Sequence, residues 1–166
     1  MSLTDRRDGV DAPARDRRTF LVLGWTVLGL AVLHLIDHAL RGQRVHDHGL
    51  NPSWDHSGWP FKPAVTPYTF SLVLVLAILI VGLWGTYAGR LRAGYWLGAA
   101  IVLGALVTYV HFVPTAQQET PAIIFGSWVS LSAVGVAAVV VTFAIVGLLL
   151  VLAVTAIRIG RRTGRW

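Results

Sequence analysis

The sequence contains no cysteine, and its only methionine is Met1. Disulfides, thiolate nucleophiles and thiolate metal ligands are therefore excluded, and a methionine-type copper(I) site has no ligands available. Charged residues are also scarce: they make up 13% of the 166 residues, whereas a soluble domain usually carries about a quarter. Together with a hydrophobic content of 55%, this shortage of charge predicts a polytopic membrane protein.

Catalytic signatures are missing as well. The chain has no nucleophile-elbow pattern, no phosphate-binding loop, no dinucleotide fingerprint and no H-E-x-x-H sequence. The sequence therefore leaves open whether the protein is an enzyme.

The net charge of +6 comes almost entirely from arginine, because Lys62 is the only lysine. These arginines flank apolar runs, which favours membrane topology and contact with anionic lipid over binding to nucleic acid. We expect the lipid bilayer to be the main partner. A four-span monomer is small for a transporter, so self-association or a partner within a membrane complex is also expected.

The apolar runs predict an all-α bundle of four transmembrane helices within a membrane domain at 19–158. The expected spans are about 20–40, 68–87, 95–113 and 135–157. Pro67 suits the first turn of the second span, with Thr66 as its cap, and Pro114 should end the third. Residues 1–18 are predicted to form a disordered tail. Residues 41–66 are predicted to form an outer lid loop, and residues 159–166 a basic tail.

The last apolar stretch, residues 122–157, would be about 50 Å long as a helix, which is too long for one crossing of a hydrocarbon core of about 30 Å. It is also too short for two crossings and a turn. Thr120-Pro121 resembles a helix start. Residues 121–134 are therefore expected to form an extension beyond the bilayer, an interfacial helix, or a helix bent near Gly126-Ser127.

Arginine placement predicts the orientation. Eleven arginines lie in the N-terminal tail, the loop between the second and third spans, and the C-terminal tail. The other two loops hold only Arg41, Arg44 and Lys62 as basic residues. By the positive-inside rule, both termini should be cytoplasmic, in the plasma (inner) membrane.

All six histidines then fall on or near the outer side. His34 and His38 are four residues apart on the first span, so their rings share one face of a helix, and Asp37 lies on the same stripe. His111 lies near the outer end of the third span. Imidazole and carboxylate ligands without sulfur favour zinc or copper(II). The predicted metal site has His34, Asp37, His38 and His111 as its core, with His46, His48 or His56 from the lid loop as further ligands.

Other interpretations stay open at this point. An ion pair between Asp37 and Arg41 would explain the acid without any metal. His111 and either His34 or His38 could ligate a b-type haem. The histidines could sense or relay protons, because imidazole titrates near physiological pH. Finally, the protein could be a structural or accessory subunit of a larger membrane complex, with no site of its own.

Overall fold

The computed structural model describes residues 3–48, 67–113, 120–128, 130–164 and 166. This part of the chain contains five helices and no strand, so the predicted all-helical class is confirmed. The helices are α1 (Leu3–His48), α2 (Pro67–Tyr87), α3 (Ala93–Phe112), α4 (Pro121–Gly126) and α5 (Ser132–Thr163).

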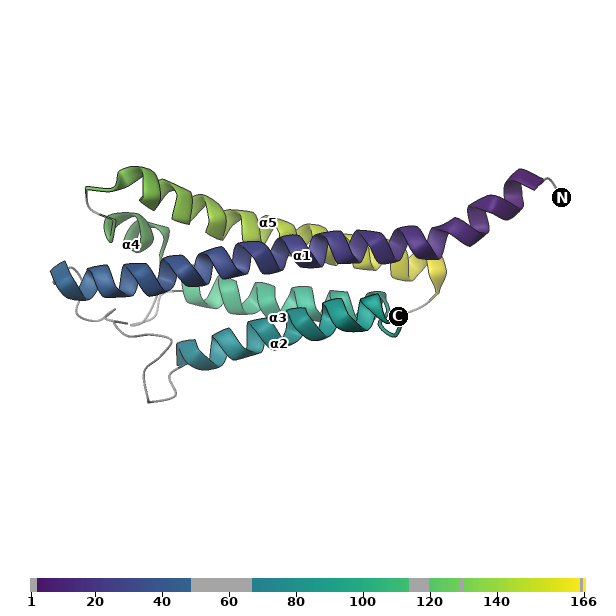
Figure 1. The fold of residues 1–166 in the computed structure, drawn as a ribbon, viewed down its shortest axis with the longest axis horizontal. Coiled ribbons are helices and arrows are strands. Elements are labelled where there is room, and N and C mark those ends of the chain that lie inside the picture. The colour runs from purple at the N-terminus through teal and green to yellow at the C-terminus, as the bar shows by residue number, and fades with distance from the viewer. Residues whose placement is uncertain (1–2, 49–66, 114–119, 129, 165) are drawn as a thin grey trace.

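The four long helices lie side by side, and the short α4 packs beside the start of α5 (Figure 1). Helix α5 packs against α3 and α1, α1 packs against α2, and α2 packs against α3. The neighbours therefore follow one another around the bundle in the order α1, α2, α3, α5. Helices α1 and α3 occupy opposite corners, so side chains that connect these two helices must cross the interior.

Three helical segments among the described residues are long and apolar enough to cross a membrane: Ala14–Val45, Ala93–Phe112 and Ser132–Thr163. A fourth apolar segment, Ser71–Tyr87, is shorter. Large apolar side chains on these helices stay exposed, and Trp25, Ile101 and Leu150 each expose 60% or more of their surface. Water-soluble proteins rarely leave such extended apolar surfaces uncovered. The bundle is therefore suited to a lipid environment.

The core of the bundle is built around Trp96 of α3, which is fully buried. Its ring stacks on Phe20 of α1 with centroids 6.0 Å apart, and its Nε1 donates a hydrogen bond to Thr86 Oγ1 of α2 at 2.8 Å. Glycines on α1 and α2 make room for the ring. A Cβ added at Gly24 or Gly82 would lie 2.7 or 2.9 Å from Trp96 Cη2. Trp96 therefore connects α3 with α1 and α2, and glycine at positions 24 and 82 allows these two helices to approach its ring.

Helix α1 begins earlier than expected. Residues 3–18, predicted to be a disordered tail, are helical. Towards the end of the bundle where the termini lie, Asp16 forms an ion pair with Arg162 of α5, and Arg17 donates a hydrogen bond to the Tyr87 carbonyl of α2. The prediction considered only the lack of apolar residues. It did not consider the polar contacts of Asp16 and Arg17, which fix one helical turn. Once a turn has formed, each further residue joins the helix at little free-energy cost.

Helix α1 also ends later than expected, at His48, so the predicted loop 41–66 begins as helix. Two side-chain pairs at i, i+4 spacing support this extension. Arg41 Nε lies 3.0 Å from Asp37 Oδ2, and Gln43 Nε2 donates to Asp47 Oδ1 at 2.8 Å. The rest of the predicted lid loop, residues 49–66, lies outside the described residues.

The other helix ends show which local signals were reliable. Helix α2 begins at Pro67, as predicted, whereas Thr66 and Pro114 lie outside the described part of the chain. Within the stretch 121–134, residues 121–126 form the separate short helix α4 and residues 132–134 already belong to α5, so the helix breaks after Gly126. Helix α5 continues to Thr163 and is capped by Gly164 at a φ of 63°. Residues 159–163, predicted to belong to the basic tail, are therefore helical.

The N-terminus of α4 provides a local test. Thr120 Oγ1 accepts a hydrogen bond from the Ile123 amide at 3.3 Å, and Pro121 occupies the first turn, as the sequence predicted. Replacing Thr120 with alanine should destabilise α4 by about 1 kcal/mol, seen as faster amide hydrogen exchange at Ile123. Thr19→Ala is the control, because that hydroxyl only donates to the Arg15 carbonyl within α1. Unchanged exchange in Thr120→Ala would contradict a capping role.

Candidate functional site

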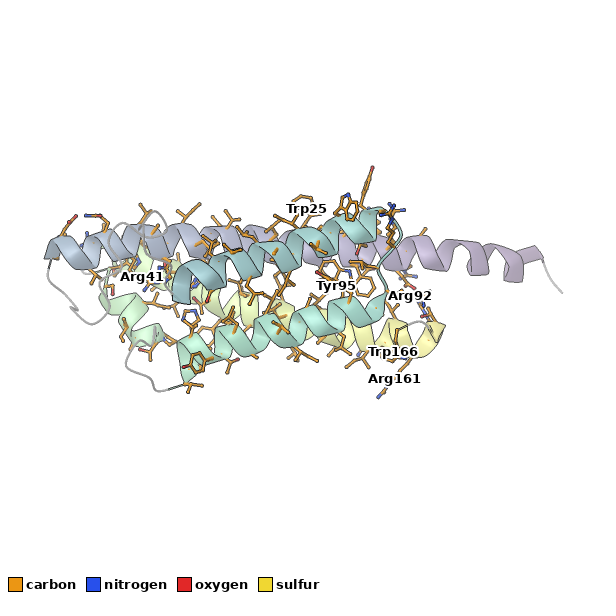
Figure 2. All side chains as sticks on the ribbon, turned by 90° about the horizontal axis from the view of Figure 1, so that it is seen from below. Trp25, Arg41, Arg92, Tyr95, Arg161 and Trp166 are labelled. Atoms are coloured by element: carbon orange, nitrogen blue, oxygen red, sulfur yellow. The ribbon has the colours of Figure 1, made fainter. Side chains whose placement is uncertain are left out.

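Polar side chains enter the bundle at the end away from the two termini. His34, His38 and Arg41 recur at spacings of four and three residues on α1, which places them on one face of the helix. His38 is 4% exposed and Arg41 is 0% exposed. Figure 2 shows Arg41 at this end of the bundle, far from Arg92 and Arg161 near the other end. After the orientation expected from the sequence, we label the Arg41 end the outer end and the opposite end the inner end.

His34 of α1 meets His111 of α3 inside the bundle. Their ring centroids are 5.1 Å apart with an interplanar angle of 77°, and His111 is 2% exposed. The two residues lie on helices at opposite corners, so the contact spans the interior. Metal–imidazole bonds are about 2 Å long, so one ion could join two rings at this separation after a small rotation of the side chains.

His38 lies further from this pair. The centroids of His34 and His38 are 6.5 Å apart, with nearly perpendicular rings. Of the rings of His34, His38 and His111, those of His34 and His111 make the closest contact. Among the residues that the structure describes, however, no group of three or more histidines and acids has the arrangement of a metal site.

Asp37, predicted from the sequence as a metal ligand, contacts two other side chains in the structure. Its Oδ2 lies 3.0 Å from Arg41 Nε, and its Oδ1 accepts a hydrogen bond from Trp128 Nε1 at 2.9 Å. Both carboxylate oxygens are thus engaged by buried donors. The alternative interpretation from the sequence, an ion pair between Asp37 and Arg41, is what the structure contains.

Arg44 makes a second connection between α1 and the turn before α5. Its guanidinium lies over the Trp128 ring at 5.8 Å, and its Nη2 donates to Ser130 Oγ at 3.2 Å. Ser130 has a φ of 65°, an uncommon conformation for a residue other than glycine. Beneath the turn, Trp128 packs with Ile124 in a small core of its own. We call Asp37, Arg41, Arg44, Trp128 and Ser130 the outer clamp.

Of the three loop ligands expected from the sequence, His48 does not join the pair. His48 is exposed, its Nδ1 lies 3.0 Å from the Arg44 carbonyl, and it is 14 residues beyond His34, about 21 Å along the helix. His46 lies on the same last turns of α1, and His56 lies outside the described residues. Both stay predictions from the sequence.

Trp128, Arg44 and Ser130 were not singled out by the sequence. Trp128 follows an apolar run and a Gly-Ser pair, which is also typical of a tryptophan at a membrane interface. Its partner Asp37 lies 91 residues earlier. The available signal was the acid within an apolar span, because such an acid needs a donor close by. No family model matches the chain, and no match is found among curated proteins or solved structures.

Proposed function

We propose that the protein crosses the plasma (inner) membrane four times, through α1, α2, α3 and α5, with both termini in the cytoplasm. The helix Ser71–Tyr87 is apolar and packs between α1 and α3, although it is shorter than the other three. The N- and C-termini lie towards the same end of the bundle (Figure 1), and Arg92 and Arg161 lie near that end (Figure 2). The positive-inside rule assigns this end to the cytoplasm. The histidine pair then faces the outside.

The function we propose is binding of a divalent transition metal, zinc or copper(II), at His34 and His111, with His38 as a third ligand. The supporting observation is the 5.1 Å separation of two imidazoles whose residues are 77 positions apart. Imidazole is a common ligand of both metals. Asp37 is assigned to hold Arg41 and Trp128 rather than to ligate. Transport, sensing and catalysis would each build on this binding step.

Metal binding can be tested on purified protein by elemental analysis and by zinc titration. His34→Ala and His111→Ala should each weaken binding at least about 100-fold, because even groups outside the ligand set change affinity by 10- to 100-fold. His48→Ala is the control, since that ring is exposed and lies far along α1. Binding should weaken in acid, because protonated imidazole cannot ligate.

An accessory role without a ligand is the second candidate, and the outer clamp favours it. The ion pair and the indole hydrogen bond of Asp37 explain why polar groups are buried there without any bound metal. Folded protein that binds no metal would support this role. A Soret band in the visible spectrum would instead support haem. His34 and His111 would then have to separate, because rings 5.1 Å apart leave no room for a macrocycle between them.

A further inference from the structure

Two arginines at the inner end lie against exposed aromatic rings. The Arg17 guanidinium of α1 is 5.4 Å from the centroid of the Tyr87 ring at the end of α2, and Arg90 lies 5.4 Å from the Trp84 ring. Both rings face outward, with Tyr87 71% and Trp84 60% exposed. We call these four residues the arginine–aromatic patch.

The chemistry of the patch suits a phosphate at the membrane surface. A guanidinium carries five N–H donors in one plane and pairs well with phosphate oxygens. Arg17 donates one hydrogen bond to the Tyr87 carbonyl, which fixes the position of its guanidinium. This bond uses only one of the five N–H donors of the group. Contact with a ring also reduces the entropy lost when an anion binds, because the side chain is already placed.

The charge balance at this end favours an anion. Asp16 is the acid with a described side chain at this end, and it is paired with Arg162 of α5 rather than with Arg17 or Arg90. The other acids with described side chains, Asp37 and Asp47, lie in the outer half of α1. The arginine–aromatic patch therefore carries a positive charge at the level where aromatic residues meet lipid headgroups.

Apolar side chains on the same two helices are also exposed, and Ile80 lies four residues before Trp84 on one face of α2. Val22 and Trp25 of α1 and Ile80 of α2 are each at least half exposed. A phosphate attached to hydrocarbon chains would place its charge on the arginines and its chains along this surface. A soluble phosphate would gain only the first contact.

We propose that the arginine–aromatic patch binds the headgroup of an anionic phospholipid. This inference is independent of the metal site at the outer end, because no residue is shared between the two. The patch selects lipid by headgroup charge and sits beside the turn between α2 and α3.

The test uses the full chain in detergent. Thermal stability and lipid retention by native mass spectrometry are measured with added phosphatidylglycerol, phosphatidylcholine or inorganic phosphate. Phosphatidylglycerol should bind and stabilise the protein, and the other two should not. Arg17→Gln with Arg90→Gln should weaken phosphatidylglycerol binding roughly 30-fold, given the typical contribution of each arginine near an anionic surface.

Arg92→Gln with Arg161→Gln is the matched control, because it removes two arginines near the same end without touching the patch. It should keep most of the lipid binding. An equal loss in this control would overturn the proposal in favour of general surface attraction, and equal stabilisation by inorganic phosphate would overturn it in favour of a soluble anion. Trp84→Leu keeps every charge and should still weaken retention. Unchanged retention in that variant would overturn the role of the ring, even if the double arginine variant fails to fold.

Discussion

Replacing Asp37 with alanine should destabilise the folded protein by roughly 3 to 5 kcal/mol, the range typical for breaking a buried ion pair by removing one partner. Arg41 is 0% exposed, and the Asp37 carboxylate lies 3.0 Å from its Nε. Without that carboxylate, the buried guanidinium of Arg41 has no opposite charge beside it, so its burial costs more free energy. Trp128 Nε1 also loses its acceptor, which adds the cost of an unsatisfied buried donor.

Unfolding in mixed detergent micelles, followed by far-UV circular dichroism, measures this effect. Asp47→Ala is the matched control, because Asp47 is exposed and accepts only from Gln43 on the same helix. It should change stability by less than about 0.5 kcal/mol. Replacing both partners, Asp37→Leu with Arg41→Met, should cost less than Asp37→Ala alone, since no buried charge is left behind. Equal losses in Asp37→Ala and Asp47→Ala would show that the ion pair contributes nothing to stability.

Alanine at Gly24 or Gly82 should cost roughly 1 to 3 kcal/mol each, as overpacking of a filled core usually does. The new methyl group would lie 2.7 Å from Trp96 Cη2 at Gly24, and 2.8 Å from Tyr95 Cε1 at Gly82. Trp96 cannot move away cheaply, because it stacks on Phe20 and its Nε1 is bonded to Thr86. The expected result is a lower unfolding midpoint in the same micelle assay.

Gly29→Ala in α1 and Gly104→Ala in α3 are the controls, because a Cβ at either position meets nothing within 4 Å. Both should keep or slightly raise stability, since alanine is the better helix former. Adding Trp96→Phe to Gly24→Ala should cost less than the sum of the two single changes, because the smaller ring relieves the clash. A midpoint for Gly24→Ala equal to that of Gly29→Ala would show that the ring is not confined as described.

The parts of the fold that local chemistry determines were predictable. A proline begins α2, and Thr120 with Pro121 begins α4, because these residues satisfy or remove the amides that a helix start leaves without partners. The length of α1 was not predictable by the same reasoning. Its early turns depend on an ion pair with Arg162, which lies 146 residues later in the chain.

The candidate site was predictable in part for a related reason. Because the bilayer levels the helix ends, His111 was expected at a depth similar to that of His38. Which histidine it meets depends on how α1 and α3 face each other across the bundle, and the observed partner is His34. The role of Asp37 depends on Trp128, which lies in the turn after α4 and donates to the carboxylate. No pattern of residues in the sequence predicts that turn.

The unbroken course of α1 has a mechanical consequence. From Ala14 to Val45 it is a single helix of 32 residues, about 48 Å long, whereas the hydrocarbon core is about 30 Å thick. A continuous helix of this length has no hinge at which a tilt or an axial shift could be absorbed. Because α1 is continuous between them, a movement of Arg41 along the helix axis would be transmitted to Arg17.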